Sequence, residues 1–450
     1  MVIILVRNFK INDLSANISA LVKKQLFSNL IIVASLTLFV KCLGFLKESV
    51  VASEFGLSQQ LDTFYIAMLI PGFITTVFLG SFKTVFIPNY ISEMRTGNNM
   101  GSFQSVGFLV VLGVSTLFLL FAVLITDVYV ENFFAGHTEQ YYHQVKMQFY
   151  IIAPCIIIWG LSSLVSGLLN INNEFKYSSL NTIFTPLVII VCVLYFSSIF
   201  GSVLLAVGTL IGSTLNFLFL VFIAFKRKVI FFSKPDFKNP NAQIMFSQVP
   251  AKVSSGFLTG LTSVTDQFFA AQLAIGSIAA LNYGQKMPAF ITGLLIMTIG
   301  SVLLPHFSKK VVANREKAFE ELYKLLKTLF IASCGIALVA ILMSDYLVQL
   351  FFERNEFTSE DTKIVSSIQK ITLLYAPFAI CGMVLVNFLT SINKNAFMAW
   401  IALGSMLLNI LLDYVGMKFY GVYGITIATT TIMVLRSLVL LKFTINQRSK

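Results

Sequence analysis

The sequence has few charged residues and few of the side chains that usually perform catalysis. Charged residues make up 12% of the 450 positions, against about 25% in soluble domains. No phosphate-binding loop of the GxxxxGK[ST] type and no GxGxxG turn occurs. These absences exclude an ordinary soluble protein and a pump that hydrolyses ATP by itself.

Metal-binding and redox patterns are also missing. The three histidines, His137, His143 and His306, are isolated and lack the HExxH spacing of zinc enzymes. The five cysteines are scattered singly through apolar segments, with no CxxC pair. We therefore expect no metal or cofactor, apart from a coupling ion, and interpret the cysteines as small core residues.

Apolar residues are abundant instead: 57% of the chain is hydrophobic, and mean hydropathy is +0.84. This is enough for about twelve spans of ~20 residues, the length of helix that crosses a ~30 Å hydrocarbon core. The sequence thus predicts an all-α polytopic membrane protein. The expected spans are residues 27–54, 61–87, 103–126, 145–170, 182–200, 203–225, 250–275, 278–304, 325–343, 368–392, 397–417 and 421–445.

Lysines and arginines are distributed unevenly between the two sides of these spans. Of those outside the spans, 19 lie in the two terminal segments and the alternate loops between them, and three, Arg354, Lys363 and Lys418, lie on the other side. Such a bias places both termini in the cytoplasm. It also accounts for the net charge of +12 without a nucleic-acid partner.

A basic loop separates the spans into two sets of six. We expect a cytoplasmic N-terminal segment (1–26), an N-lobe (27–225), a linker (226–249), a C-lobe (250–445) and a cytoplasmic tail (446–450). With an offset of 217 residues, Pro71 to Pro88 aligns with Pro288 to Pro305, and six of the 18 positions are identical. Six intervening spans give the two copies the same orientation, as in transporters with two parallel lobes.

Charged residues inside the spans are the candidate functional residues, because a lysine at the bilayer centre costs about 2.5 to 3.5 kcal/mol on insertion. They are Lys41, Lys47, Glu48, Asp266 and Lys286. Lys47, Asp266 and Lys286 are each eight or nine residues from the outer span ends, about 12 to 14 Å deep at 1.5 Å per residue. They are therefore expected to lie at one level between the lobes.

Two interpretations of these charges remain open. Ion pairs, either Lys47 with Asp266 or Lys286 with Glu48, would hold the lobes together. Alternatively, the excess of three lysines over two acids would favour an anionic head group such as a pyrophosphate. Asp266 would take part in an ion pair or bind a coupling proton or sodium ion.

Other span residues have simpler explanations. Long cationic side chains near span ends can extend to the head groups, which applies to Lys146, Lys252, Lys370 and Arg436. The equivalent prolines of the repeat, Pro71 and Pro288, are the expected hinges of a rocking motion. An alternative is that they are packing kinks only.

Several longer segments resemble the MurJ (MviN) lipid II flippase family, which belongs to a superfamily with the Wzx O-antigen flippases and the MATE exporters. The segments are LTLFVKCLGFLKESVVASEFGLSQQLDTFYIAMLIPGF (36–73), GLLNINNEFKYSSL (167–180), SVTDQFFAAQLAIGSIAALNYGQKMPAF (263–290), LLPHFSK (303–309) and FFERNEFTSEDT (351–362). They occur in family order over nearly the whole chain. The resemblance implies a MATE-like fold with two six-helix lobes.

The resemblance also implies roles for the charged residues. Lys41, Lys47 and Lys286 stand where the family has cavity arginines that bind the head of the lipid-linked precursor, and Glu48 and Asp266 stand where it has acids. Two features depart from the family pattern. Thr75 and Thr76 replace an arginine after the span-2 proline, and twelve spans are expected where family members typically have fourteen.

The sequence thus predicts a transporter and not an enzyme. It would move an undecaprenyl-pyrophosphate-linked saccharide, similar to lipid II, from the cytoplasmic to the outer leaflet by alternating access, driven by membrane potential. We expect a monomer. The alternatives are a Wzx-type flippase for O-antigen or capsule units, an integral-membrane glycosyltransferase or polysaccharide polymerase, and a MATE-like exporter of a cationic amphiphile.

Overall fold

The computed structural model describes residues 35–96, 99–134 and 136–448, and helix is the only regular secondary structure in these ranges. A helix covers residues 35–55. The helices that follow in the first half are α2 (Gln59–Ile74), α3 (Gly80–Thr96), α4 (Met100–Phe133), α5 (Glu139–Ile152), α6 (Cys155–Ile171), α7 (Phe175–Leu180), α8 (Phe184–Phe200) and α9 (Leu204–Lys226). Those of the second half are α10 (Pro240–Ala270), α11 (Ser277–Ala313), α12 (Arg315–Leu342), α13 (Ser344–Phe352), α14 (Ser359–Leu373), α15 (Ala376–Ser391) and α16 (Asn395–Asn446).

Many of these helices are long and apolar enough to cross a membrane. Seven such helical segments occur in the described ranges, and two of them, Phe175–Lys226 and Asn395–Asn446, have 52 residues each. At 1.5 Å per residue, 52 residues extend about 78 Å, more than twice the hydrocarbon thickness. Each contains a glycine with positive φ, Gly201 at +48° and Gly421 at +57°, where the chain reverses. The predicted all-α polytopic membrane fold is confirmed.

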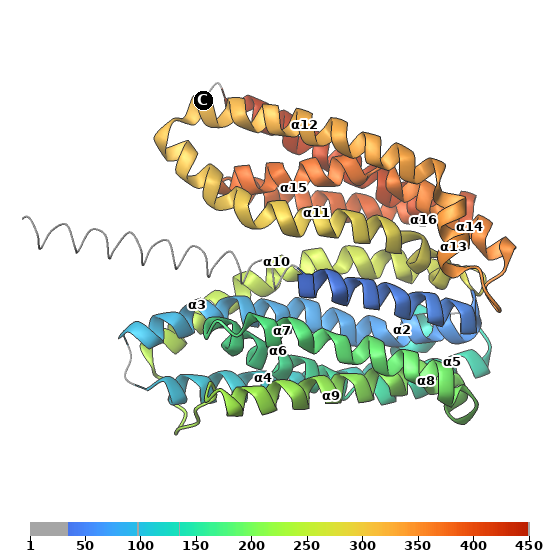
Figure 1. Ribbon diagram of the computed structural model, residues 1–450, viewed down its shortest axis with the longest axis horizontal. Helices are drawn as coiled ribbons and strands as arrows, with labels where there is room; N and C mark the ends of the chain where they lie inside the picture. Colours follow the sequence, from blue (N-terminus) through green and yellow to red (C-terminus); the bar gives the residue numbers. More distant parts are fainter. Residues whose placement is uncertain (1–34, 97–98, 135, 449–450) are drawn as a thin grey trace, which may run out of the picture.

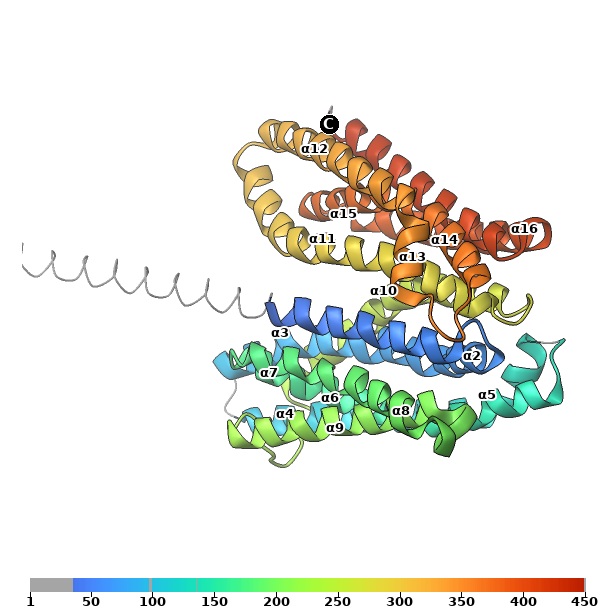
Figure 2. The same ribbon diagram turned by 45° about the vertical axis from the view of Figure 1, so that its right-hand side comes forward.

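The helices form two groups (Figures 1 and 2). We call residues 35–226, with α2–α9, the N-lobe, and α10–α16 the C-lobe. Helix α10 lies between the groups, packed against α3 on one side and α16 on the other. It begins at Pro240, within the segment expected as a linker, because Asn239 accepts a hydrogen bond from the backbone N–H of Ala242 and caps the helix.

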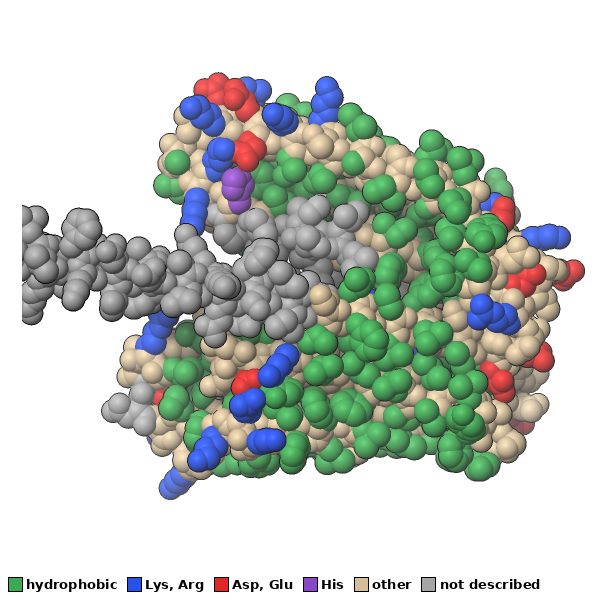
Figure 3. Space-filling model, viewed as in Figure 1, with side chains coloured by type: hydrophobic (Ala, Val, Ile, Leu, Met, Phe, Trp, Pro, Cys, Tyr) green, Lys and Arg blue, Asp and Glu red, His purple; other side chains and the backbone are tan. Residues whose placement is uncertain are grey.

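The surface shows how the molecule sits in a bilayer. In Figure 3, hydrophobic side chains cover the middle of the visible face, and charged side chains gather at its two ends. Large side chains such as Leu124, Leu342 and Phe419 are more than three-quarters exposed, which suits contact with lipid and not with water. We call the end that includes the ends of α3, α9 and α11 the lysine-rich end.

Candidate substrate site between the lobes

The carboxylate of Glu48 joins the two lobes. Its Oε1 accepts hydrogen bonds from Lys47 Nζ at 2.7 Å and from Lys286 Nζ at 2.8 Å. Glu48 and Lys47 lie on the helix 35–55 of the N-lobe, whereas Lys286 lies on α11 of the C-lobe. Glu48 is 8% exposed. The structure therefore contains the expected Lys286–Glu48 ion pair, and Lys47 shares the same acid.

A third lysine, Lys41, also lies between the helix 35–55 and α11. The Lys41 Nζ is 3.8 Å from the point where a Cβ on Gly293 of α11 would be, so this side chain also extends from the N-lobe towards the C-lobe. In the described part of the chain, Lys41 has no ion pair. Three lysines, Lys41, Lys47 and Lys286, and the single acid Glu48 give the cluster a formal net charge of +2. A lysine acts on a phosphate as a point charge, so the cluster can attract a pyrophosphate.

The lobes are sealed at the end opposite the lysine-rich end, which we call the closed end (residues 53–62, 271–279 and 353–358). Asp62 of α2 accepts hydrogen bonds from the backbone N–H groups of Gly276 at 2.6 Å and Ala279 at 2.9 Å. It caps α11, whose first turn has no cap from its own N-cap residue. A carboxylate is favourable at the positive end of a helix, and this one comes from the other lobe.

Backbone contacts complete the seal. The Glu356 N–H donates to Ser53 O at 3.1 Å, and Asn355 Nδ2 donates to Ser53 Oγ at 2.9 Å. A Cβ on Gly56 would lie 2.4 Å from Glu356 O, and one on Gly276 would lie 2.6 Å from Leu57 O. Both glycines have positive φ. Glycine is needed at these positions because the two lobes approach each other through their backbones.

The buried apolar side chains also differ between the closed end and the lysine-rich end. One cluster fills the N-lobe and continues into the C-lobe at the closed end, through Val348, Phe352 and Phe357. A second cluster, around Phe319 and Phe388, is separate and lies in the lysine-rich half of the C-lobe. Within the described residues, α10 packs against the N-lobe as far as its first turns, where Ala242 and Met245 belong to the first cluster. The other C-lobe helices share this core only towards the closed end, and they diverge from the N-lobe towards the lysine-rich end (Figures 1 and 2).

Asp266 lies in a different cluster from the lysines. Its carboxylate accepts hydrogen bonds from Thr429 Oγ1 at 2.8 Å and Asn409 Nδ2 at 3.2 Å, and Asn409 Nδ2 also contacts Asp413. All four side chains belong to the C-lobe and are at most 9% exposed. The structure therefore does not bring Asp266 to Lys47, and the expected common level does not make the two residues neighbours.

This C-lobe cluster has the chemistry of a small cation site. Asp413 Oδ1 and Asn409 Oδ1 are buried and accept no hydrogen bond in the described structure. Hard cations prefer carboxylate, amide and hydroxyl oxygens, and all three kinds converge here. The described ranges contain no group of three or more His, Cys, Asp or Glu residues with metal-binding geometry.

The repeated prolines share a local structure. Thr75 Oγ1 donates to Pro71 O at 2.8 Å, and Thr292 Oγ1 donates to Pro288 O at 2.7 Å. A π-helical turn (Thr75–Leu79) follows Pro71, and such turns are frequent at functional sites. Pro288 lies within the continuous helix α11. A hinge role for the two prolines remains a prediction.

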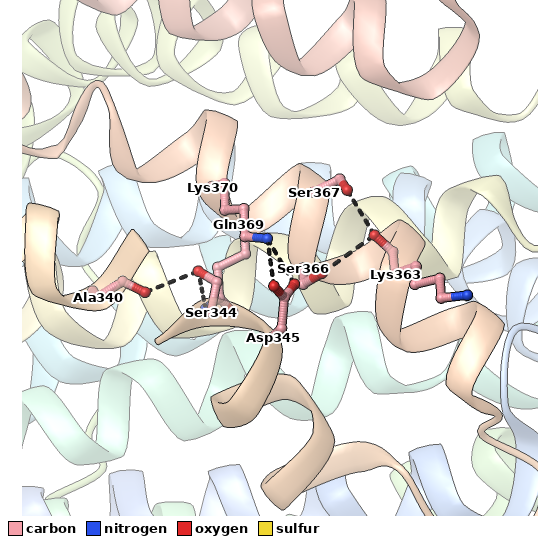
Figure 4. A network of polar contacts seen from close by, with 8 residues as sticks. All are labelled: Ala340, Ser344, Asp345, Lys363, Ser366, Ser367, Gln369 and Lys370. Atoms are coloured by element: carbon pink, nitrogen blue, oxygen red, sulfur yellow. Dashed lines mark hydrogen bonds and ion pairs between the residues drawn. The ribbon is translucent and has the colours of Figure 1, made fainter. Parts of the chain in front are cut away.

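Two of the four charges expected near span ends, Lys146 and Lys370, form ion pairs close to the closed end. Lys146 contacts Asp127 and Glu131 at 2.7 Å each. Lys370 of α14 contacts both carboxylate oxygens of Asp345 at 2.7 Å (Figure 4). The hydrogen bond from Lys370 holds the pKa of Asp345 below its usual value.

Sequence reasoning missed two acids and one amide that form polar contacts in the closed end and in the Asp266 cluster. Asp62, Asn409 and Asp413 all lie in predicted spans, and the two acids could have been found by the same criterion that selected Asp266. Their roles depend on partners more than 140 residues away for Asp62 and for the Asn409–Asp266 contact. Spacing along the chain could not have indicated these contacts.

Solved structures resemble more than nine-tenths of the chain. The structure titled "Lipid II flippase MurJ, inward closed conformation" is 25% identical, covers 92% of this chain and 87% of its own, and superposes with a TM-score of 0.80. An inward-facing multidrug resistance MATE family transporter of the MOP superfamily is 12% identical, with a TM-score of 0.75 and coverage of 93% and 98%. This second likeness shows the fold alone.

Sequence comparisons agree with the likeness to the MurJ structure. The "Lipid II flippase MurJ" of Thermosipho africanus is 28% identical over 412 residues, which are 90% of this chain and 82% of that protein. The "Probable lipid II flippase MurJ" of Vibrio cholerae serotype O1 is 25% identical over 432 residues, 91% and 81% of the two chains. The family model described as "Lipid II flippase MurJ" matches residues 51–450. The chain therefore belongs to the MurJ lipid II flippase family.

Proposed function

We propose that this protein moves an undecaprenyl-pyrophosphate-linked saccharide of the lipid II kind from the cytoplasmic to the outer leaflet of a bacterial inner membrane. The observation that carries the proposal is the lysine cluster between the lobes of a MurJ family member: Lys47 and Lys286 share Glu48, and Lys41 has no acidic partner among the described residues. No bond is broken in this process, so the protein acts as a transporter and not as an enzyme.

We infer the direction of transport from which side of the membrane the closed end faces. The lysine-rich end faces the cytoplasm by the positive-inside rule, with both termini there, so the closed end faces outwards. In this state the pyrophosphate reaches the cluster from the cytoplasm. The pyrophosphate would compete with Glu48 for Lys47 and Lys286. This competition would weaken the Lys286–Glu48 ion pair, which joins the lobes. Opening of the closed end then exposes the head group to the outside.

The membrane potential can drive this step. A pyrophosphate carries negative charge, and each charge moved outwards across an inside-negative potential releases about 2.3 kcal/mol per 100 mV. The saccharide and phosphates move through the interior, and the polyprenyl tail stays in lipid. A single copy of the chain contains both lobes, so a monomer suffices.

The test is growth of bacteria depleted of their own lipid II flippase. The wild-type chain should restore growth, and Lys47→Gln and Lys286→Gln should not, although both variants insert in the membrane. Lys363→Gln provides a matched control, because Lys363 is an exposed lysine near the closed end. Full activity of both site variants would exclude the pyrophosphate role of the cluster.

A Wzx-type substrate is the second candidate. Thr75 and Thr76 occupy the place of a family arginine, and lysines cannot form the bidentate contact of arginines with a phosphate. The same plasmids should therefore be placed in a strain lacking its O-antigen flippase. Rescue of that strain alone would assign the protein to surface-polysaccharide export.

We also propose that the Asp266 cluster couples transport to a proton or sodium ion. The free oxygens of Asn409 and Asp413 support this role. Transport into vesicles by the wild-type chain should depend on a sodium or proton gradient, and Asp266→Asn should remove that dependence. Unchanged gradient dependence in the variant would exclude coupling at Asp266. Asp345→Asn, outside this cluster, is the control.

A further inference from the structure

A groove on the C-lobe is distinct from the site between the lobes. Its walls are formed by α12, α15 and α16, and it encloses about 260 Å³. Leu326 and Phe330 come from α12, Phe378 and Cys381 from α15, and Leu438 and Leu441 from α16. Helix α12 lies at the edge of the C-lobe farthest from the N-lobe in both views (Figures 1 and 2).

The hydroxyl and thiol groups in the walls already have hydrogen-bond partners. Ser437 Oγ donates to Phe378 O at 2.7 Å, and the Cys381 thiol contacts Leu326 O. The groove therefore offers an apolar surface to its contents. Only a hydrocarbon chain suits such a surface in a membrane, because a polar ligand would lose its hydrogen bonds there.

A lysine marks one end of the groove. Lys327 lines it and has no ion pair or hydrogen bond in the described part of the chain. It is the last charged residue of α12 before 15 uncharged residues, 328–342, which extend about 22 Å at 1.5 Å per residue. Lys327 therefore lies at the boundary between head groups and hydrocarbon. Lys442 of α16 lies one turn beyond Leu438, on the same helix face.

The internal repeat shows that this charge is particular to the C-lobe. Leu109 and Leu161 line an N-lobe groove of about 350 Å³, and an offset of 217 residues relates them to Leu326 and Phe378. The third wall of the N-lobe groove consists of Phe232 and Pro235, and no charged residue lines it. The two lobes thus share the groove, whereas the lysine at its end occurs in the C-lobe alone.

We propose that the C-lobe groove binds an anionic phospholipid of the leaflet at the lysine-rich end, with an acyl chain between α12, α15 and α16 and the phosphate beside Lys327 and Lys442. Basic pockets between membrane helices on the cytoplasmic side bind anionic head groups in general. The position of α12 far from the N-lobe favours a separate lipid over the tail of a substrate bound between the lobes. This site is independent of the transported saccharide.

Tryptophan quenching by brominated lipids tests the proposal. Phe330→Trp is the reporter, in a chain whose Trp159 and Trp400 are replaced by phenylalanine. Ile331→Trp is the control, because Ile331 has nearly the same depth on α12, is 62% exposed and does not line the groove. Both proteins are reconstituted in phosphatidylcholine vesicles with increasing fractions of brominated phosphatidylglycerol or, separately, brominated phosphatidylcholine.

We expect the Phe330→Trp reporter to prefer phosphatidylglycerol about fivefold, from the typical effect of one basic residue near a membrane, and the Ile331→Trp control to show no preference. Lys327→Gln with Lys442→Gln should abolish the preference, and Lys317→Gln, an exposed lysine away from the groove, should leave it intact. Leu438→Trp gives a second reporter if Phe330→Trp does not fold.

Three results would overturn the proposal. Equal quenching of the Phe330→Trp reporter by the two lipids would mean ordinary solvating lipid. A preference that survives the double lysine variant would mean that these lysines do not recognise the head group. Relief of the reporter's quenching by added polyprenyl phosphate, at concentrations that leave the Ile331→Trp control unchanged, would mean that the groove holds the substrate tail.

Discussion

Single residues determine the chemistry of the site, and Glu48 has the largest role among them. Its one carboxylate forms ion pairs with lysines from both lobes, at 2.7 and 2.8 Å. Removing one member of a buried charge cluster is costly, because the remaining charges lose their compensation. Glu48 therefore stabilises the two lysines while leaving the cluster cationic overall.

Glu48→Gln should lower thermal stability by more than about 1 kcal/mol, because Lys47 and Lys286 then repel each other without an acid between them. Inorganic pyrophosphate should restore part of the loss by taking the place of the carboxylate. Thermal unfolding in detergent, with and without pyrophosphate, measures both effects.

The control is the double variant Lys47→Gln with Lys286→Gln, which should gain no stability from pyrophosphate. If pyrophosphate stabilised this double variant as much as Glu48→Gln, the anion would bind elsewhere and the prediction would be wrong.

At the scale of elements, the closed end depends on the close approach of loops and helix ends. Gly56 precedes α2 and Gly276 precedes α11, and each faces backbone atoms of another segment. The cap from Asp62 to α11 holds the same region together from one lobe to the other. These contacts stabilise the outward-closed state alone, because they are lost when the lobes separate.

Gly56→Ala and Gly276→Ala should therefore shift the population towards the outward-open state, because a Cβ would lie within 2.6 Å of backbone oxygens of the facing segment. Spin labels at Glu139→Cys in the N-lobe and Lys363→Cys in the C-lobe, in a chain without its native cysteines, report the distance between the lobes.

Gly136→Ala is the matched control, because Gly136 also has positive φ but an added Cβ would meet no atom within 4 Å. It carries the backbone strain without the clash. An unchanged distance distribution in both gate variants, or the same shift in the control, would contradict the role of close packing.

Helices α13 and α14 are joined by the Asp345–Lys370 ion pair (Figure 4). The folded-state pKa of Asp345 is lowered by this hydrogen bond. The pair thus contributes stability above the unfolded pKa of about 3.9, and the contribution is lost as pH falls through the lower folded pKa. The pair is exposed, so its effect stays below about 1 kcal/mol.

We expect the wild-type chain to unfold at a slightly higher temperature than Asp345→Asn at pH 7, and the difference to shrink as the pH is lowered below about 4. Parallel melting curves from about pH 7 to about pH 3 measure it, a range that spans the unfolded pKa. If the difference in unfolding temperature between the two proteins grew on acidification, the ion pair would not be what lowers the pKa of Asp345.

At the scale of the whole molecule, the described contacts join the N-lobe to α11 and α13–α14 at the closed end, whereas at the lysine-rich end only α10 of the C-lobe shares the N-lobe core. Transport by alternating access requires the closed end to open, and this requires Ser53 of the N-lobe to move away from Asn355 of the C-lobe. A covalent link between these residues should therefore stop transport without disturbing the site for the pyrophosphate.

Ser53→Cys with Asn355→Cys, in a chain without native cysteines, should form a disulfide under oxidising conditions and abolish flipping in vesicles. Reduction should restore it. Each single cysteine variant serves as a control that remains active in both conditions. Undiminished transport by the cross-linked protein would mean that this end does not open.

Much of this architecture could be predicted from the sequence. The all-α membrane fold and the MurJ family are confirmed, because apolar runs of span length and family segments such as FFERNEFTSEDT are local properties of the chain. The Lys286–Glu48 ion pair was one of two expected pairings, and depth in the membrane could not select it. Asp266 shows the limit of that argument, since residues at one depth can face different helices.

The sequence by itself thus determined which segments cross the membrane, because burial of apolar residues in lipid depends on composition and length alone. It also determined that charges lie within the spans. The tertiary structure decided which charges meet, that Asp62 caps α11 across the lobes, and that Asp266 joins Asn409, Asp413 and Thr429. These contacts depend on helix rotation and crossing, which side-chain packing between distant segments sets.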